Sequence, residues 1–168
     1  MLPAPDQATM RPNVRRLFTY WEGLAGGSTP ERQLVDPADI VPLLPYLMLV
    51  EFSHDPFRVR YRLTGTRVDE LTGMNLTGRY LDEFRYGDGE ATILHLEDGY
   101  RECAATGIPY HGLYDWKSSA GYMKQIAFGL FPLKVDGVIR QCLSIEDYTG
   151  ISPDTQMITW SAPVSRKL

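Results

Sequence analysis

The chain of 168 residues is poor in the side chains that most often carry chemistry, because it holds only two cysteines and three histidines. No stretch approaches 18 uninterrupted apolar residues, which excludes a membrane-spanning helix. The first residues also lack the apolar core of a signal peptide. Cys103 and Cys142 therefore favour a reducing, cytoplasmic setting, in which they are small buried hydrophobic residues rather than a redox pair.

Recognisable catalytic and metal motifs are also missing. No Gly-x-Ser-x-Gly or Ser/His/Asp order occurs, and no spacing of His, Cys, Asp and Glu is typical of a metal site. The glycines at 87 and 89 lack the further glycine or Lys-Ser/Thr of a phosphate-binding loop. A net charge of −4 gives no electrostatic attraction to nucleic acid. We therefore expect no metal and no nucleic-acid partner.

What the chain does have is ordinary globular composition, with 43% hydrophobic residues in a length that suits one domain. Strict alternation from Phe57 to Thr64 predicts a half-buried strand. Further strands are predicted at 47–52, 108–116, 122–133 and 138–148, with a helical group between the second and third. This order indicates an α+β fold, a five-stranded antiparallel sheet with helices on one face and an additional N-terminal amphipathic helix.

The additional helix is predicted from helical spacing of apolar residues, and Gly26-Gly27 ends it. Its apolar stripe must be covered either by the domain's own sheet or by a partner, such as a second copy of the chain. The stripe, which is the candidate partner or dimer surface, consists of Val14, Leu17, Phe18 and Trp21. Residues 1–9 are expected to be a flexible N-terminus, 10–148 the domain and 149–168 a C-terminal extension.

The segment FRVRYRLTGTRVDELTGMNLTGRYLDEF, residues 57–84, resembles the second strand and connecting helices of PAS sensory domains. Tyr20-Trp21 and Asp36-Pro37 are similar to features of short, single-domain PAS-like proteins found mostly in alphaproteobacteria. The resemblance spans roughly residues 13–147. It implies a non-catalytic sensory or regulatory module that binds a small ligand, a signalling protein or both, with a homodimer as one form of partner.

The helical group is broken by glycines, so it is predicted to form a cupped roof over the sheet, and such a cup is suited to a small ligand. A completely filled core is the alternative. The facing of the fourth strand is open, because that strand is apolar on both sides. The candidate ligand-binding residues are Tyr61, Leu63, Leu71, Leu76, Phe84, Leu96, Tyr100, Met123 and Phe128.

The resemblance also raises two cofactors, and neither is expected here. His95 lies on the helix where haem-binding PAS domains carry their axial histidine, but a single histidine is not sufficient for a haem site. Flavin-binding light sensors need a reactive cysteine in the helical connection, and the corresponding residues, MNLTGRYLDEF, contain none.

Two other kinds of function compete with the sensory one. A small isomerase or hydratase would use Asp115 with Tyr61, Tyr110 and Tyr122, although Asp115 lies at a strand end. A structural adaptor would have a filled interior.

The charged residues can be explained by structural roles. The adjacent acids Asp69-Glu70, Asp82-Glu83, Glu97-Asp98 and Glu146-Asp147 are expected to have structural roles. Arg58, Arg60 and Arg62 form a row that either meets an acidic or phosphorylated partner or is a solvated face with cross-strand acids such as Glu51 and Glu146.

Overall fold

The computed structural model describes residues 10–118 and 120–152. Five antiparallel strands form one sheet in the order β2-β1-β5-β4-β3, which confirms the predicted fold class. The strand ends differ by at most two residues from those expected from the sequence. The strands are β1 (Leu47–Ser53), β2 (Arg58–Thr64), β3 (Tyr110–Lys117), β4 (Met123–Val135) and β5 (Val138–Asp147).

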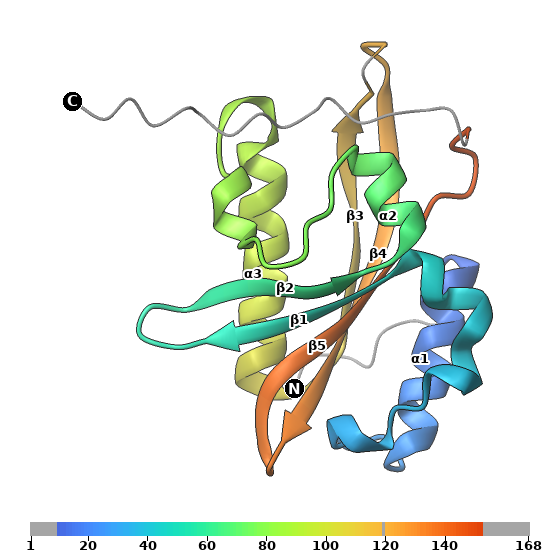
Figure 1. The fold of residues 1–168 in the computed structure, drawn as a ribbon, viewed down its shortest axis with the longest axis vertical. Coiled ribbons are helices and arrows are strands. Elements are labelled where there is room, and N and C mark those ends of the chain that lie inside the picture. The colour runs from blue at the N-terminus through green and yellow to red at the C-terminus, as the bar shows by residue number, and fades with distance from the viewer. Residues whose placement is uncertain (1–9, 119, 153–168) are drawn as a thin grey trace.

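Helices cover both faces of this sheet, and Figure 1 shows α3 and α1 on opposite sides of it. The face under α2, η4 and α3 is called the inner face below, and the face under α1 and η3 the outer face. Each face has its own buried apolar cluster. The helices are α1 (Pro12–Leu24), η2 (Arg32–Leu34), η3 (Pro37–Tyr46), α2 (Thr66–Thr72), η4 (Leu81–Phe84), η5 (Gly87–Gly89) and α3 (Glu90–Thr106).

Local sequence explains the short elements. The side chain of Asp36 accepts a hydrogen bond from the Ala38 N–H at 2.9 Å and so caps η3. Pro42 and Pro45 have no N–H to donate, which agrees with a 3-10 element in place of a regular α-helix. At the β4–β5 hairpin, Asp136 and Gly137 both have positive φ, as the predicted Asp-Gly turn requires.

The junction between β2 and α2 depends on a close backbone approach. A Cβ added at Gly65 would lie 2.3 Å from the Pro45 carbonyl oxygen and 2.4 Å from that of Leu44. Both obstacles are backbone atoms, so they cannot rotate away. The absence of a side chain at Gly65 therefore lets η3 pack against the first turn of the roof.

The amphipathic helix packs on its own sheet, the first of the two alternatives left open by the sequence. Val14, Leu17, Phe18 and Trp21 are all buried within the chain. The Trp21 indole donates a hydrogen bond of 2.8 Å to the Pro132 carbonyl. While α1 is docked these side chains cannot contact a partner, so the prediction of a partner or dimer surface formed by them is wrong for this form. The physical reason is that the apolar outer face of β4 and β5 offers the stripe a covering within the same chain.

We predict that Leu17→Ala lowers the free energy of unfolding by about 2–5 kcal/mol, because it leaves a cavity between α1 and the sheet. Chemical denaturation followed by tryptophan fluorescence measures this loss. Leu34→Ala is the matched control, since Leu34 is largely exposed and its truncation should change stability by less than about 0.5 kcal/mol. Equal losses in both variants would contradict the docking of α1.

Candidate functional site

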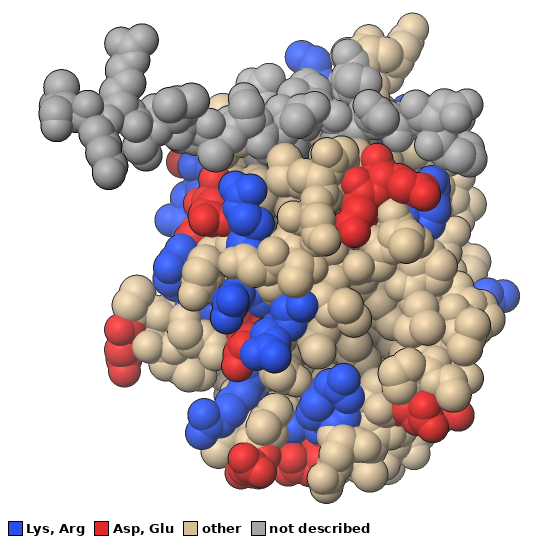
Figure 2. Space-filling view, in the orientation of Figure 1, with Lys and Arg blue, Asp and Glu red and all other residues tan. Residues whose placement is uncertain are grey.

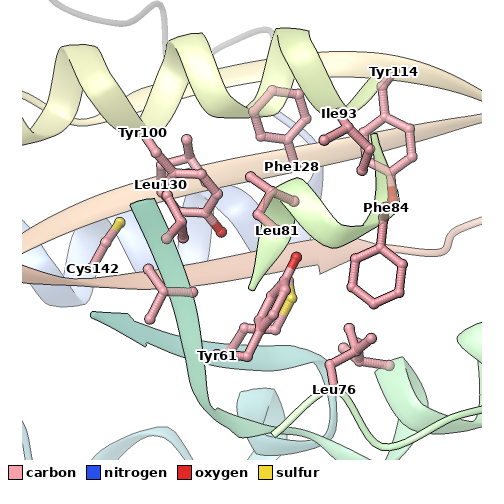
Figure 3. Packing of buried hydrophobic residues seen from close by; sticks show 14 of the residues in the cluster. Tyr61, Leu76, Leu81, Phe84, Ile93, Tyr100, Tyr114, Phe128, Leu130 and Cys142 are labelled. Atoms are coloured by element: carbon pink, nitrogen blue, oxygen red, sulfur yellow. The ribbon is translucent and has the colours of Figure 1, made fainter. Parts of the chain in front are cut away.

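A small cavity lies between the inner face of the sheet and the roof made by α2, η4 and the first turns of α3. Its volume is about 60 Å³, which is room for roughly four to six water molecules. Figure 3 shows Tyr61, Phe84, Ile93 and Tyr114 approaching one another from different elements in this region. The lining residues are Met48, Tyr61, Val68, Thr72, Met74, Leu76, Phe84, Thr92, Ile93, Leu96, Tyr114, Trp116 and Glu146.

Four of the nine residues expected to bind a ligand line this cavity, namely Tyr61, Leu76, Phe84 and Leu96. Three others, Leu71, Tyr100 and Phe128, are buried in the same apolar cluster without lining the cavity. The Tyr100 hydroxyl is engaged in a buried hydrogen bond of 2.7 Å with the Ser144 hydroxyl. These three side chains therefore belong to the core that surrounds the cavity and not to its lining.

The remaining two, Leu63 and Met123, are exposed, so their assignment to the ligand site is wrong. Register explains Leu63, because Val50 pairs with Tyr61 while Leu49 pairs with Leu63, which leaves Arg62 as an extra residue. This bulge turns Leu63 to the same face as Leu49, the outer one, although Tyr61 two residues earlier points inward.

The assignment of Met123 to the ligand site is wrong for a different reason, because this residue lies at the end of a hairpin. It pairs with Lys117 at the start of β4, beyond the residues that α3 covers. Further along β4, Ile126, Phe128 and Leu130 belong to the inner cluster and Ala127, Phe131 and Leu133 to the outer one. The sequence left open which side of β4 faces the cavity, and the structure shows that Ile126, Phe128 and Leu130 face the inner side.

The residue that sequence reasoning missed is Glu146, which was expected to be a structural acid or a cross-strand partner of the arginine row. It lies near the end of β5 and lines the cavity. The Tyr114 hydroxyl donates a hydrogen bond of 2.6 Å to Glu146 Oε2. Strand periodicity carries the signal, because Cys142, Ser144 and Glu146 alternate with the outward-facing Leu143 and Ile145.

The protonation of this carboxyl group is shifted by its surroundings. Burial, only partly opposed by the neighbouring hydroxyl groups of Tyr114 and Tyr148, raises the pKa of Glu146 to about 7. Burial likewise raises the pKa values of the nearby Tyr61, Tyr114 and Tyr148, so these phenols remain neutral donors at physiological pH. Near neutral pH the cavity therefore contains one acid that exchanges a proton easily.

The next residue along the strand faces the opposite layer. The carboxylate of Asp147 accepts a 2.9 Å hydrogen bond from the Asn13 N–H in the first turn of α1, and another of 2.9 Å from the Thr149 N–H. Burial alone would raise the pKa of Asp147, but donors from Thr149 and Asn13 outweigh it and hold the pKa below its usual value. Glu146 therefore lines the cavity, whereas the next residue, Asp147, accepts a hydrogen bond from the first turn of α1.

The residues named for an isomerase do not form a site. Asp115 is exposed, Tyr122 is exposed, and Tyr110 stacks on Phe128 at an edge of the core away from the cavity lining. Of that set only Tyr61 lines the cavity. The assignment of Asp115 is therefore wrong, and the strand-borne carboxyl group that such a mechanism would need is Glu146.

His95 does not line the cavity either. Its ring packs edge-on against the rings of Tyr110 and Phe128, with centroid distances of 6.3 and 5.7 Å. Both cysteines, Cys103 on α3 and Cys142 on β5, are fully buried and absent from the cavity lining. The residues present thus offer neither an axial ligand nor an adduct-forming thiol to a group placed in the cavity.

The arginine row has acidic partners, as the solvated-face interpretation required. Arg58 makes a two-pronged pair with Asp82, at 2.7 and 2.8 Å, and Arg62 pairs with Glu51 at 3.0 Å. Figure 2 shows basic and acidic side chains interspersed over this side of the molecule. Glu146, the other acid proposed for the row, lies on the opposite face of the sheet, so that pairing is wrong.

Several adjacent acids have structural partners, as expected. Asp69 accepts a hydrogen bond from the Thr64 hydroxyl at 2.6 Å, and Glu83 pairs with Arg79 at 2.9 Å. Glu70 pairs with Arg67. The nearly buried Glu97 lies between Arg85 and Arg101. Of these contacts, the pair of Glu97 with Arg85 links α3 to the residue that follows η4.

The described part of the chain was also expected to hold no metal site and no membrane-spanning helix. Residues 10–118 and 120–152 contain no group of three or more His, Cys, Asp and Glu side chains placed to hold a metal ion. Within the same residues, no helix has the length and apolar character needed to cross a membrane.

One protein-family model matches the chain. A family model described as PAS domain matches residues 9–96, just over half of the chain. No curated protein matches the chain.

Solved structures with a similar fold include light-oxygen-voltage proteins. An RNA-binding receptor of this type has 17% identity and a TM-score of 0.49, covering 71% of this chain and 36% of that one. A Rhodobacter sphaeroides light-oxygen-voltage protein has 15% identity and a TM-score of 0.47, covering 70% of both chains. The photo-excited blue-light photoreceptor Vivid has 13% identity and a TM-score of 0.48, covering 82% and 98%.

The raised pKa of Glu146 predicts a specific dependence of stability on pH. The unfolded chain ionises this group near its ordinary pKa of 4.5, and the folded chain does so near 7. Between these values the unfolded state is favoured progressively, so the fold loses stability as the pH rises through the window. We expect the unfolding free energy of the native protein, relative to Glu146→Gln, to fall by about 2–3 kcal/mol from pH 4.5 to pH 7.5.

Urea denaturation of both proteins across this range measures the difference. Glu90→Gln is the control, because Glu90 lies at the exposed start of α3 outside the cavity. Its difference from the native protein should not vary with pH in the window. A Glu146→Gln difference that is equally flat would contradict the shifted pKa.

Proposed function

Because the chain belongs to the PAS domain family, we propose that it is a sensory or regulatory module whose inner cavity binds a small, mostly apolar ligand. The observation that carries this proposal is a cavity lined mainly by apolar and aromatic side chains with one titratable carboxyl group. Ligand sites in proteins have this composition, an apolar lining with a few convergent polar groups. We further propose a cytoplasmic location, in keeping with two buried thiols.

The response to the ligand would pass through the end of β5. Glu146 contacts the cavity, and Asp147 holds the first turn of α1 through the Asn13 N–H. A ligand that moves or changes the charge of Glu146 would displace the backbone that also positions Asp147. The position of α1 on the outer face would then be read by a signalling protein or by a second copy of the chain.

Haem and flavin form no part of the proposal. A volume of about 60 Å³ is far below the several hundred Å³ of pockets that hold large ligands. The lining contains neither cysteine nor histidine. The residues present therefore fit a much smaller molecule.

A second candidate function is a small isomerase, and one observation favours it. Glu146 is a strand-borne carboxyl group with a pKa near 7, and a tyrosine donor lies beside it. However, the Tyr114 hydroxyl donates to Glu146 itself, so it is not poised to stabilise a separate substrate oxygen. The sensory proposal does not need that hydroxyl to be free. A structural adaptor would not need the cavity at all.

We predict that native mass spectrometry of the protein, purified from its own host, detects a retained small molecule. Leu96→Trp should remove that mass, because Leu96 lines the cavity and an indole would fill it. The control is Leu94→Trp on the same helix, at a side chain that is substantially exposed. This control should retain the molecule.

Two results would contradict binding in the cavity. One is a clean apo mass for the native protein, and the other is equal retention by both tryptophan variants. Circular dichroism of each variant would confirm that it is folded, so that loss of the molecule is not loss of the fold.

We also predict that Asp147→Ala loosens α1 without unfolding the sheet. The substitution removes the acceptor of the Asn13 N–H, and loss of a capping carboxylate costs about 1–2 kcal/mol. Amide hydrogen exchange measured by mass spectrometry should accelerate in α1 and remain unchanged in β4. The coupling route would be contradicted if exchange accelerated equally in both elements, or in neither.

A further inference from the structure

The cavity lining contains one side chain that can carry a negative charge and no side chain that carries a positive one. Glu146 is the single ionisable acid in the lining, and no lysine, arginine or histidine joins it. A carboxylate offers about four acceptor positions on its two oxygens. The Tyr114 hydroxyl, which donates to Glu146 Oε2, occupies only part of this capacity. A donor supplied from within the cavity would therefore be accommodated.

Aromatic side chains surround the same space. Tyr61 from β2, Phe84 from η4, and Tyr114 and Trp116 from β3 all line the cavity. Aromatic rings attract cations through the negative potential of their faces, and clusters of such rings recognise ammonium groups. A carboxylate adds direct ionic attraction in a poorly solvated setting.

We propose, as an extension that rests on the proposed function, that the cavity selects a small organic cation, namely a short apolar molecule carrying a primary ammonium group. The ammonium group pairs with the Glu146 carboxylate among the aromatic side chains, and the apolar part contacts Leu76, Ile93 and Leu96. The volume restricts the ligand to about the size of a four-carbon amine. A carboxylate-bearing ligand of the same size is rejected by like charge.

Binding of such a cation is linked to protons, and the surrounding groups are compatible with that linkage. Tyr61 on β2, Tyr100 on α3, Tyr114 on β3 and Tyr148 after β5 all have raised pKa values, mainly because they are buried. The cation that faces this cluster is Arg67 on α2, whose charge partly opposes the rise in the pKa of Tyr148. Between pH 5.5 and pH 8 the group in this cluster that changes charge is therefore Glu146.

Three isosteric probes test the proposal, and isothermal titration calorimetry at pH 8 measures their affinities for the native protein. Isobutylamine is a cation, isobutanol is neutral and isobutyrate is an anion of nearly the same shape. We expect isobutylamine to bind at least tenfold more tightly than isobutanol, and isobutyrate not to bind. The preference for the amine over the alcohol should fall to near unity at pH 5.5, where Glu146 is protonated.

Glu146→Gln should reduce the amine preference at pH 8, measured as the ratio of the two affinities in the same variant, to within about twofold. Glu90→Gln, a loss of one negative charge outside the cavity, should leave the preference unchanged. Equal affinities for the amine and the alcohol, a preference that survives Glu146→Gln, or tighter binding of isobutyrate would overturn the selection of cations while binding in the cavity stood. Failure of all three probes to bind, together with a clean apo mass, would overturn the cavity as a ligand site as well.

Discussion

The arrangement depends on strand β5, which lies in the middle of the sheet and is covered on both faces. It pairs with β1 on one side and β4 on the other. Because side chains alternate along a strand, successive residues of β5 pack against the helices on opposite faces of the sheet. Leu143 and Ile145 hold α1 and η3, whereas Cys142 and Ser144 face α3. The adjacent acids at its end continue this alternation, so the cavity and the anchor of α1 are separated by a single peptide unit.

Placing an acid at this position opposes stability, and the surroundings explain why the fold tolerates it. An unpaired carboxylate in an apolar interior is strongly disfavoured, and such a group responds by taking up a proton. Glu146 follows this behaviour, with a pKa near 7, and the Tyr114 hydroxyl supplies a hydrogen bond of 2.6 Å. By contrast, the buried Glu97 lies between two arginines. The two acids therefore differ in how their charge is accommodated, because Glu97 has cationic partners and Glu146 has a tyrosine hydroxyl.

Much of the fold could be predicted from the sequence, since it follows from strong local signals. Alternation in β2, the apolar stripe of α1 and the Asp-Gly turn each identify an element, and the order of elements identifies the sheet. The cavity was only partly predictable. Leu63 was misplaced because a bulge in β2 shifts the register, and no residue type there announces it. Met123 was misplaced because it lies at the end of the β3–β4 hairpin, where its side chain is exposed. Glu146 was missed although β5 has a readable period of two, because the pair Glu146-Asp147 was interpreted like the adjacent acids of the helices and not by strand alternation.

The roof over the cavity explains why the site is small and how it is tied to the sheet. Gly73 ends α2 with a left-handed residue, and the chain then returns to the edge strand β2. There the Tyr61 N–H donates to the Arg79 carbonyl at 2.9 Å and the Gly78 N–H donates to the Tyr61 carbonyl at 2.7 Å. Tyr61 therefore lines the cavity with its side chain and fastens the roof with its backbone. Any enlargement of the cavity by movement of residues 78–80 would break these two bonds and expose the β2 edge. The loss of these two hydrogen bonds opposes opening of the roof. The cavity that we propose as a ligand site would therefore favour a molecule that fits the existing space.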